Sequence, residues 1–385
     1  MESAESAILM RANLQAKKNR PSFYHGKVCD VFCSGNLIEI GFLSGRCCND
    51  RRGSCIMCDY GAANGIRPIQ EYLVEMDRIL EEAAPSVHVL LLCTNGSFLD
   101  RTQISQELFQ AVLERAAQSQ IEWIEIETHY KDVTPKKLRQ IQHLLPNKRI
   151  AIEMGLETTN PVYQSHIIMK EIDLAAYERT VALIQSFGFL AEVNIMVGLP
   201  FLSPKEQFDD AVRTMEWAFR HGCGLVVFPM NIKPYTLLME MFRSGHYQPI
   251  SSWMLPLLLD TLSGPQLEQV TVAWYGNREE IYPETQERAI FSRSCPSCAA
   301  EIKRVYRQFS ETAGGNERKA LLAQLFSRAG RRGCSCRPDA QNEISAQPQD
   351  TFESQYAKYI SYLKDRSQGD VAHEGTAVLD RDPEQ

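Results

Sequence analysis

Apolar runs of strand length alternate along the chain with longer stretches in which apolar residues recur at helical spacing. This alternation is typical of an α/β domain built on a parallel sheet. Six such strand–helix units in series predict a partial (β/α)6 barrel of the TIM type. A doubly wound sheet is the alternative, because spacing alone does not choose between them. The predicted strands are 36–43, 87–93, 121–127, 149–157, 190–198 and 224–231, and the predicted helices lie near 68–84, 105–118, 134–145, 173–187, 203–221 and 235–244.

Residues at the helix ends support this assignment. Ser203-Pro204-Lys205-Glu206 places a capping hydroxyl, a first-turn proline and a back-reaching carboxylate at the offsets of a capping box. Gly188 stands where a helix ending at residue 187 needs a left-handed residue.

Three of the predicted strands carry polar residues at every second position. Successive strand residues point to opposite faces of a sheet, so one face of these strands is apolar and the other is polar. A closed barrel fills its interior with branched apolar side chains, so carboxylates there predict a cavity that holds a ligand. The alternative is that each acid is paired with Lys or Arg from a neighbouring strand. The residues on this face are Glu125 and Glu127, then Glu153, Gly155 and Glu157, then Glu192, Asn194, Met196 and Gly198.

Composition narrows the class of protein. The chain has 385 residues, of which 44% are hydrophobic, and a formal net charge of −7. It has room for a large core with an appendage, but it lacks the basic stripe of a dedicated nucleic-acid binder. The longest apolar runs, 87–93 and 255–259, are too short to cross a bilayer, and the first residues lack the layout of a secretion signal. We therefore expect a cytoplasmic protein whose twelve cysteines include metal ligands.

Three cysteines follow the first predicted strand closely enough to bind one cluster. Cys55 and Cys58 are separated by two residues, and Cys47 or Cys48 precedes them. Three thiolates can hold three corners of a 4Fe–4S cube and leave the fourth iron open. S-adenosylmethionine bound at that iron can be cleaved reductively. The alternatives are a structural zinc site, which needs four closed ligands, and unrelated free thiols.

Beyond residue 260 the strand–helix alternation stops. We divide the chain into an N-terminal extension (1–35), the barrel (36–260), a cysteine-rich metal-binding region (261–340) and a polar tail (341–385). The tail is expected to be partly disordered, apart from an amphipathic patch at 352–363. Two close cysteine pairs flank a helical stretch, an arrangement that suits a second iron–sulfur cluster or a tetrahedral zinc ion. These pairs are Cys295 with Cys298 and Cys334 with Cys336.

Several short motifs occur in a fixed order along the chain. They are Cys-Ile-Met-Cys-Asp-Tyr-Gly (55–61), Thr-Asn-Gly-Ser (94–97), Ile-Glu-Thr-His-Tyr (126–130), Glu-Met-Gly-Leu-Glu-Thr (153–158), Met-Val-Gly-Leu-Pro (196–200) and Lys-Pro-Tyr-Thr (233–236). The combination resembles the radical S-adenosylmethionine (SAM) superfamily. Within it, the run is similar to the branch that contains the radical component of archaeosine synthase, with the elongator catalytic subunit more distant.

The resemblance implies roles for particular residues. Cys55 and Cys58 match two cluster ligands, and Cys47 is preferred to Cys48 as the first. Implied cofactor contacts are Thr94, Asn95, Gly96 and Ser97 for the methionine amino group, Glu127 and Glu157 for ribose hydroxyls or substrate, and Gly198 and Pro200 for the adenine. His129 and Tyr130 follow a strand at the barrel mouth and are the candidates for substrate contact or proton transfer.

The implied activity is cleavage of SAM to a 5′-deoxyadenosyl radical that abstracts hydrogen from a nucleoside-type or modified-base substrate, with C–N bond cleavage or a related step. It requires a one-electron reductant of the flavodoxin or ferredoxin type and allows a partner transferase or transfer RNA. One alternative is a sulfur-inserting enzyme of nucleoside natural-product biosynthesis, with the second cluster as sulfur source. Another is a zinc-stabilised, non-catalytic binding or scaffold subunit.

Overall fold

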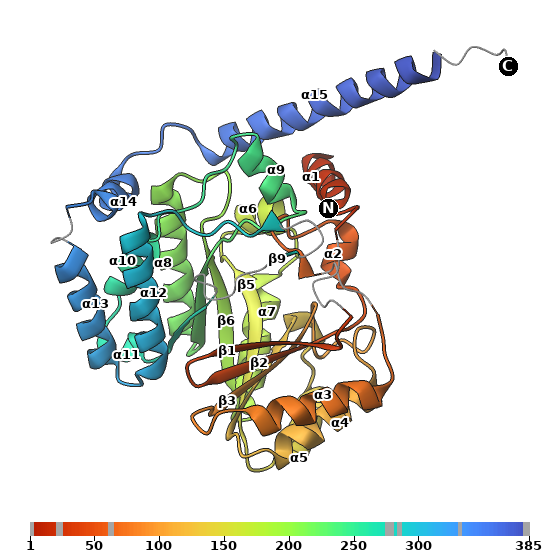
Figure 1. Ribbon diagram of the computed structural model, residues 1–385, viewed down its shortest axis with the longest axis vertical. Coiled ribbons are helices and arrows are strands. Elements are labelled where there is room, and N and C mark those ends of the chain that lie inside the picture. The colour runs from red at the N-terminus through yellow and green to blue at the C-terminus, as the bar shows by residue number, and fades with distance from the viewer. Residues whose placement is uncertain are drawn as a thin grey trace.

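A curled eight-stranded sheet forms the centre of the molecule (Figure 1). The computed structural model describes residues 4–20, 26–60, 65–273, 281–282, 287–329 and 333–379. The strands lie in sequence order, and β1 is antiparallel to β2 while every later pair is parallel. The strands are β1 Cys29–Ser34, β2 Leu37–Phe42, β3 Val89–Thr94, β4 Trp123–Thr128, β5 Arg149–Glu157, β6 Leu190–Val197, β7 Gly224–Pro229 and β8 Val270–Val272.

The strand order decides between the two predicted architectures. A doubly wound sheet reverses its order at a switch point, whereas here each parallel strand is added beside the preceding one. The partial barrel is therefore confirmed and the doubly wound alternative is wrong. β8 lies beyond residue 260 and pairs with β7, so the parallel part of the described sheet has seven strands where six were predicted.

Helices connect successive strands and pack on the outer face of the sheet (Figure 1). Those that link the barrel strands are α2 Cys48–Arg52, α3 Ile69–Glu82, α4 Gln106–Gln118, α5 Pro135–Leu144, α6 Pro161–Tyr163, α7 Leu174–Ser186, α8 Pro204–Arg220, α9 Leu237–Arg243, α10 Met254–Asp260 and α11 Gly264–Leu267. The flanking elements are α1 Ala4–Ala16, β9 Ile281–Tyr282, β10 Glu287–Arg288, α12 Pro296–Glu311, α13 Gly315–Ala329, α14 Cys336–Ser345 and α15 Phe352–Leu379.

The predicted helix ends are confirmed where their chemistry was specific. The Ser203 hydroxyl accepts from the Glu206 amide, and the Glu206 carboxylate accepts from the Ser203 amide at 2.8 Å, which completes the capping box. Gly188 follows α7 with φ of +76°. These local hydrogen bonds were readable from sequence because their partners are three residues apart.

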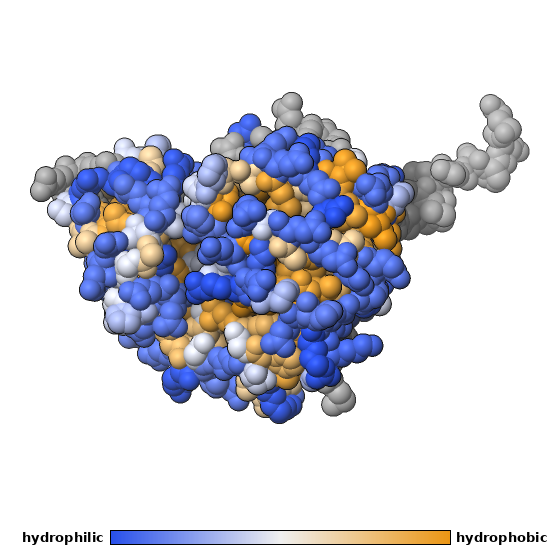
Figure 2. Space-filling view, turned by 90° about the horizontal axis from the view of Figure 1, so that it is seen from below, coloured by the Kyte–Doolittle hydropathy of each residue, from blue (hydrophilic) through white to orange (hydrophobic). Residues whose placement is uncertain are grey.

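Two apolar clusters make up the core. The larger one lies between the sheet and its helices. The smaller one lies at the C-terminal ends of the strands, where α1, the cysteine loop, the loops after β5 to β7 and the start of α15 meet. The face seen in Figure 2 is mostly hydrophilic, with apolar patches between polar residues. No helix of the described residues is long and apolar enough to cross a membrane.

The C-terminal tail contains a long helix. The amphipathic patch at 352–363 forms the first part of α15, which packs against the barrel top near α1 and then extends past the rest of the molecule (Figure 1). Disorder was expected for roughly the last 20 residues, of which 380–385 lie outside the described residues.

Candidate active site

A cavity of about 190 Å³ opens at the C-terminal ends of the parallel strands. Its wall combines thiols, amides, carboxylates and a few apolar side chains. Predicted site residues that line it are Cys47, Cys55, Cys58, Thr94, Asn95, Gly96, Glu127, His129 and Glu157. The tertiary structure thus collects residues from a stretch of more than a hundred positions into one site.

The cysteine loop follows β2 and supplies one wall of this cavity. Cys47, Cys55 and Cys58 line it, whereas Cys48 begins α2, is exposed and is not among the lining residues. This placement favours Cys47 over its neighbour as the first ligand. The Cys55 amide donates to the Ile168 carbonyl at 3.1 Å, and Cys55 has a φ of +54°, a strained value for a non-glycine residue.

The protonation chemistry of these thiols fits an iron cluster. Desolvation raises the pKa of Cys55 to about 12 and that of Cys58 to about 11, although Lys170 and Lys17 act in the opposite direction. A thiolate is the form that binds metal. A buried thiolate at Cys55 or Cys58 needs positive charge nearby to be stable. Three irons bound to the three sulfurs would supply that charge.

Gly96 lies where the end of β3 approaches the cysteine loop. A Cβ added to Gly96 would stand 2.8 Å from Cβ and 2.9 Å from Sγ of Cys47, and 2.6 Å from Oε1 of Gln103. Glycine at 96 therefore allows Cys47 to reach the cavity. Ser97 does not line the cavity: its hydroxyl bonds to Thr128 at 2.7 Å and Asp132 at 2.6 Å.

Glu157 and Lys170 form a buried ion pair on the cavity wall. Their atoms Oε1 and Nζ are 2.5 Å apart, and Glu157 Oε2 is buried without a hydrogen-bond partner among the described residues. Glu157 has a φ of +70° at a bulge where β5 meets β6. A Cβ on Gly155 would lie 2.6 Å from Glu157 Oε1 and 2.9 Å from Lys170 Nζ, so this glycine makes room for the pair.

His129 and Tyr130 are adjacent but have different surroundings. His129 lines the cavity, and its Nδ1 accepts from the Lys131 amide at 3.3 Å, which leaves the proton on Nε2. Burial and the charges of Lys170 and Lys131 lower the pKa of His129 to about 3, so the ring is neutral. Nε2 is buried and has no partner among the described residues. His129 can thus offer one N–H to a ligand.

Tyr130 is held in hydrogen bonds outside the cavity. Its hydroxyl donates to the Glu171 carbonyl at 3.3 Å and accepts from the Asp173 amide at 3.1 Å, while its ring packs on Tyr177. It does not line the cavity, so the structure does not support its candidacy for substrate contact.

In the motif at the end of β6, Met196 lines the cavity, but the two residues implied to contact the adenine do not. Neither Gly198 nor Pro200 lines it. Gly198 has a φ of +111°, and its carbonyl accepts from the Tyr247 hydroxyl at 2.7 Å. A Cβ there would lie 2.8 Å from Ile250. This geometry fits a tightly packed strand-to-helix turn.

Deeper in the barrel, three carboxylates converge. One carboxylate oxygen each from Glu125, Glu153 and Glu192 lies within 4.8 Å of the others. In the described part of the chain no Lys or Arg forms an ion pair with these three acids, so they are polar without the ion pairing that was the alternative, whereas Glu157 is paired with Lys170. Burial raises the pKa of Glu192 to about 7 and, with mutual repulsion, holds those of Glu125 and Glu153 well above their usual value.

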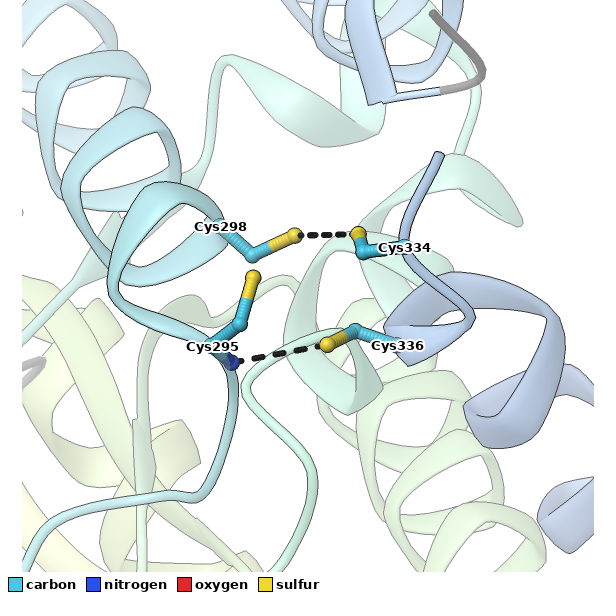
Figure 3. A group of neighbouring side chains, drawn as sticks. All are labelled: Cys295, Cys298, Cys334 and Cys336. Carbon is cyan, nitrogen blue, oxygen red and sulfur yellow. Dashed lines mark hydrogen bonds between the residues drawn. The ribbon is translucent and has the colours of Figure 1, made fainter. Parts of the chain in front are cut away.

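The C-terminal cysteines form a second site at the N-termini of α12 and α14. Sγ atoms of Cys295, Cys298, Cys334 and Cys336 all lie within 4.8 Å of one another, and their side chains point to a common centre (Figure 3). Sγ of Cys298 and Cys334 are 3.4 Å apart, and the Cys295 amide lies 3.4 Å from Cys336 Sγ. A backbone hydrogen bond from Cys298 lowers the pKa of Cys295 to about 7, which favours metal binding.

Some cavity residues were not predicted. Asn49, Asn231 and Lys233 line the cavity, with Lys233 Nζ 3.1 Å from Asp59 and 4.2 Å from the centroid of the Tyr60 ring. Lys233 is the first residue of the Lys-Pro-Tyr-Thr motif, and this motif could have indicated that Lys233 belongs to the site. The two asparagines carried no signal because amides in loops are common.

The chain is similar to several known proteins. Residues 42–218 match the model of the radical SAM superfamily. Archaeosine synthase subunit beta of Methanosarcina acetivorans is 22% identical over 57% of this chain, and that of Thermococcus kodakarensis is 24% identical over 52%. The chain spans 64% and 63% of these two relatives. Archaeal Elp3 from Methanocaldococcus infernus superposes with a TM-score of 0.44 at 11% identity, over 73% of this chain and 65% of that chain.

Residues 42–218 of this chain are therefore similar to the radical SAM superfamily. That superfamily uses a 4Fe–4S cluster and SAM, the chemistry that the cysteine loop was predicted to support.

Proposed function

We propose that Cys47, Cys55 and Cys58 hold the catalytic cluster and that the cavity beside them takes SAM. The observation that carries this is the meeting of these three thiols with Thr94, Asn95 and Gly96 around one cavity. No fourth cysteine of the described residues lines it, which suits a cluster with one iron open to a ligand. When bound, the cluster and SAM supply a 5′-deoxyadenosyl radical.

The surrounding residues orient the cofactor and substrate. Thr94 and Asn95 offer polar groups at the end of β3, and Glu127 and Glu157 offer carboxylates for hydroxyl or amine groups. His129 offers the neutral Nε2–H described above, which can donate a hydrogen bond, and because the imidazolium form is not populated near neutral pH, the ring does not act as a general acid. Gly198 and Pro200 are left without a direct role in this arrangement.

We infer that the substrate is a nucleoside or a modified base. Phe228, Asn194 and Asn231 line the same cavity as the carboxylates, and an aromatic ring together with amides and acids suits a planar base and a ribose. The 22% and 24% identity with archaeosine synthase subunit beta supports the same class. C–N bond cleavage or a related step in such a molecule is the proposed reaction.

We propose that the C-terminal cysteines hold one zinc ion. Four sulfurs bound to zinc at about 2.3 Å in a tetrahedron are separated by about 3.8 Å, and here all four lie within 4.8 Å of one another. A cube binds each sulfur to a different iron and needs wider separations. A zinc site would clamp α12 to α14 and would give no sulfide to a substrate, so the geometry weighs against sulfur insertion.

Iron, sulfide and zinc contents of the anaerobically reconstituted protein test both assignments. We expect about four irons and four sulfides with one zinc per chain, and release of 5′-deoxyadenosine when SAM and a strong reductant are added. Replacing Cys295, Cys298, Cys334 and Cys336 by Ala should remove the zinc and leave the irons. About eight irons per chain, falling to about four in that variant, would overturn the zinc proposal. Absence of 5′-deoxyadenosine from iron-loaded protein would overturn the enzyme assignment.

We also propose a partner subunit, an electron donor and a cellular compartment for this protein. The named relatives are beta subunits, so we propose a partner subunit, with transfer RNA as a further candidate and a flavodoxin or ferredoxin as electron donor. A reducing cytoplasm is the compartment that suits twelve free cysteines. Measuring 5′-deoxyadenosine with free modified nucleosides and with transfer RNA, each with and without the partner, would distinguish these cases.

A further inference from the structure

Helix α1 is joined to the cysteine loop by a fully buried asparagine. Asn13 is 0% exposed, and its Nδ2 donates to the carbonyls of Gly53 at 2.8 Å and Ser54 at 3.2 Å. Its Oδ1 accepts from the Leu237 amide at 3.2 Å, at the start of α9. One side chain thus satisfies three backbone groups that lie 40, 41 and 224 residues away.

The backbone of α1 also lies directly against this loop. A Cβ on Gly53, which has a φ of +82°, would stand 2.3 Å from the Met10 carbonyl. Leu9 and Met10 pack in the same apolar cluster as Cys55, Ile56 and Met57. The loop therefore has α1 on one side and the cavity on the other.

A buried charge network makes the third connection. Asp50 of α2 is 3% exposed and binds Lys17 at 3.0 Å, Arg20 at 2.7 Å and Arg46 at 2.6 Å. Lys17 is itself 5% exposed. Three cations around one carboxylate leave a local positive charge behind the cysteine loop, where water screens it little.

We propose that α1 is a brace for the cluster-binding loop, in which Asn13 positions the ligands and Lys17 supplies a charge that favours the reduced cluster. The inference rests on the proposed cluster at Cys47, Cys55 and Cys58. α1 lies outside residues 42–218, the stretch that matches the superfamily model, so that match assigns it no role.

The first test replaces Asn13. Asn13→Ala removes all three hydrogen bonds, and Asn13→Asp keeps the acceptor for Leu237 while facing two carbonyls with a negative charge. We expect both variants to lose the cluster at least tenfold faster than wild type when a chelator is added, followed by the fall in absorbance near 400 nm. Gln15→Ala, at an exposed position of the same helix, is the matched control and should behave as wild type.

The second test changes the charge of Lys17. Lys17→Met should lower the equilibrium constant for one-electron reduction of the cluster about tenfold, a shift of about 59 mV to a more negative potential. Lys17→Arg should stay near wild type, and so should Lys18→Met, which removes an exposed charge next in sequence. The readout is a redox titration followed by electron paramagnetic resonance, which a merely structural role would not move.

The outcomes separate the brace from the proposed function. If wild-type protein assembles no cluster at the three cysteines, the proposed function fails and the brace with it. If it does, but folded Asn13 variants keep the cluster as long as Gln15→Ala does, the positioning role of Asn13 is wrong. Equal potentials for Lys17→Met and Lys18→Met would reject the charge role. If Asn13→Ala does not fold, circular dichroism would show the loss of structure. The redox titration of Lys17→Met would then be the test of whether α1 acts on the cluster.

Discussion

The two cysteine sites use the same side chain in opposite ways. At the barrel mouth, Cys47, Cys55 and Cys58 share a cavity wall with polar residues from several strands. In the C-terminal region, four sulfurs lie within 4.8 Å of one another, with helix starts on both sides (Figure 3). A site with an open position serves chemistry, and a site closed by protein ligands serves structure. The number of cysteines alone does not distinguish them.

Their supports differ as well. The first site is held by long-range contacts: α1, the Ile168 carbonyl and the glycine at 96 all act on the loop. The second is held by two short segments, 295–298 and 334–336, each next to the first turn of a helix. Loss of a ligand should therefore abolish activity at the first site and mainly reduce stability at the second.

Cys55→Ala should have the largest effect. Removing one of three ligands leaves the cluster with two, and we expect 5′-deoxyadenosine release to fall at least about 1,000-fold, equal to about 4 kcal/mol of barrier. Chromatographic quantitation of 5′-deoxyadenosine measures it. Cys33→Ala, at an exposed cysteine of β1, is the control. A comparison of Cys47→Ala with Cys48→Ala tests the first ligand, and activity that survives the former and not the latter would reverse its assignment.

Cys334→Ala should reduce stability while sparing the first site. Loss of an ion present at 100 times its Kd lowers the free energy of unfolding by about 2.7 kcal/mol, measurable by urea denaturation with zinc analysis alongside. The irons at the first site should remain at about four per chain. Loss of those irons without unfolding would mean that the two sites are not independent.

Gly96→Ala should disturb the first site through packing. The added Cβ would meet Cys47 and Gln103 at less than 3 Å, so we expect about tenfold slower SAM cleavage, or about 1.4 kcal/mol. Gly65→Ala is the control without a clash, because its added Cβ would meet only Leu43 at an ordinary 3.7 Å. If the two variants cleave SAM equally fast, close approach at Gly96 does not matter for catalysis.

Glu192→Gln should change the pH dependence of stability. The pKa of Glu192 is raised by burial to about 7 from an ordinary 4.5, so the folded state holds an extra proton between these values. Stability from this group is complete below pH 4.5 and is lost as pH rises toward 7. At pH 8 the variant should be more stable than wild type in urea denaturation, and the difference should shrink as the pH falls below 7. Glu122→Gln, at an exposed residue, should leave the profile unchanged, and an unchanged profile in Glu192→Gln would refute the burial argument.

Much of the barrel was predictable because its signals are local. All six predicted strands are present, since a buried parallel strand is a short apolar run between helical patterns. β1 was missed, as its six residues Cys29–Ser34 alternate too weakly to stand out. α1 was missed as well, because its buried positions include Ser6 and Asn13, which do not mark an apolar face.

The candidate site was predictable in part. Motif residues at the ends of β3, β4 and β5 reached the cavity, because parallel strands end at a common edge. Ser97 and Tyr130 did not, because each is turned into a hydrogen-bond network whose partners lie more than thirty residues away. Gly198 points its carbonyl to Tyr247 for the same reason.

The alternation of strands and helices, the helix caps and the spacing of both cysteine groups follow from the sequence, because these depend on residues close together in the chain. The three-dimensional packing was needed to show that Cys47 and not Cys48 faces the cavity, that the C-terminal sulfurs lie within 4.8 Å of one another, and that Asn13 bonds to the cysteine loop. Such choices depend on which distant backbone groups must be satisfied once water is excluded. The residues next to each position in the sequence do not show which distant groups it will contact.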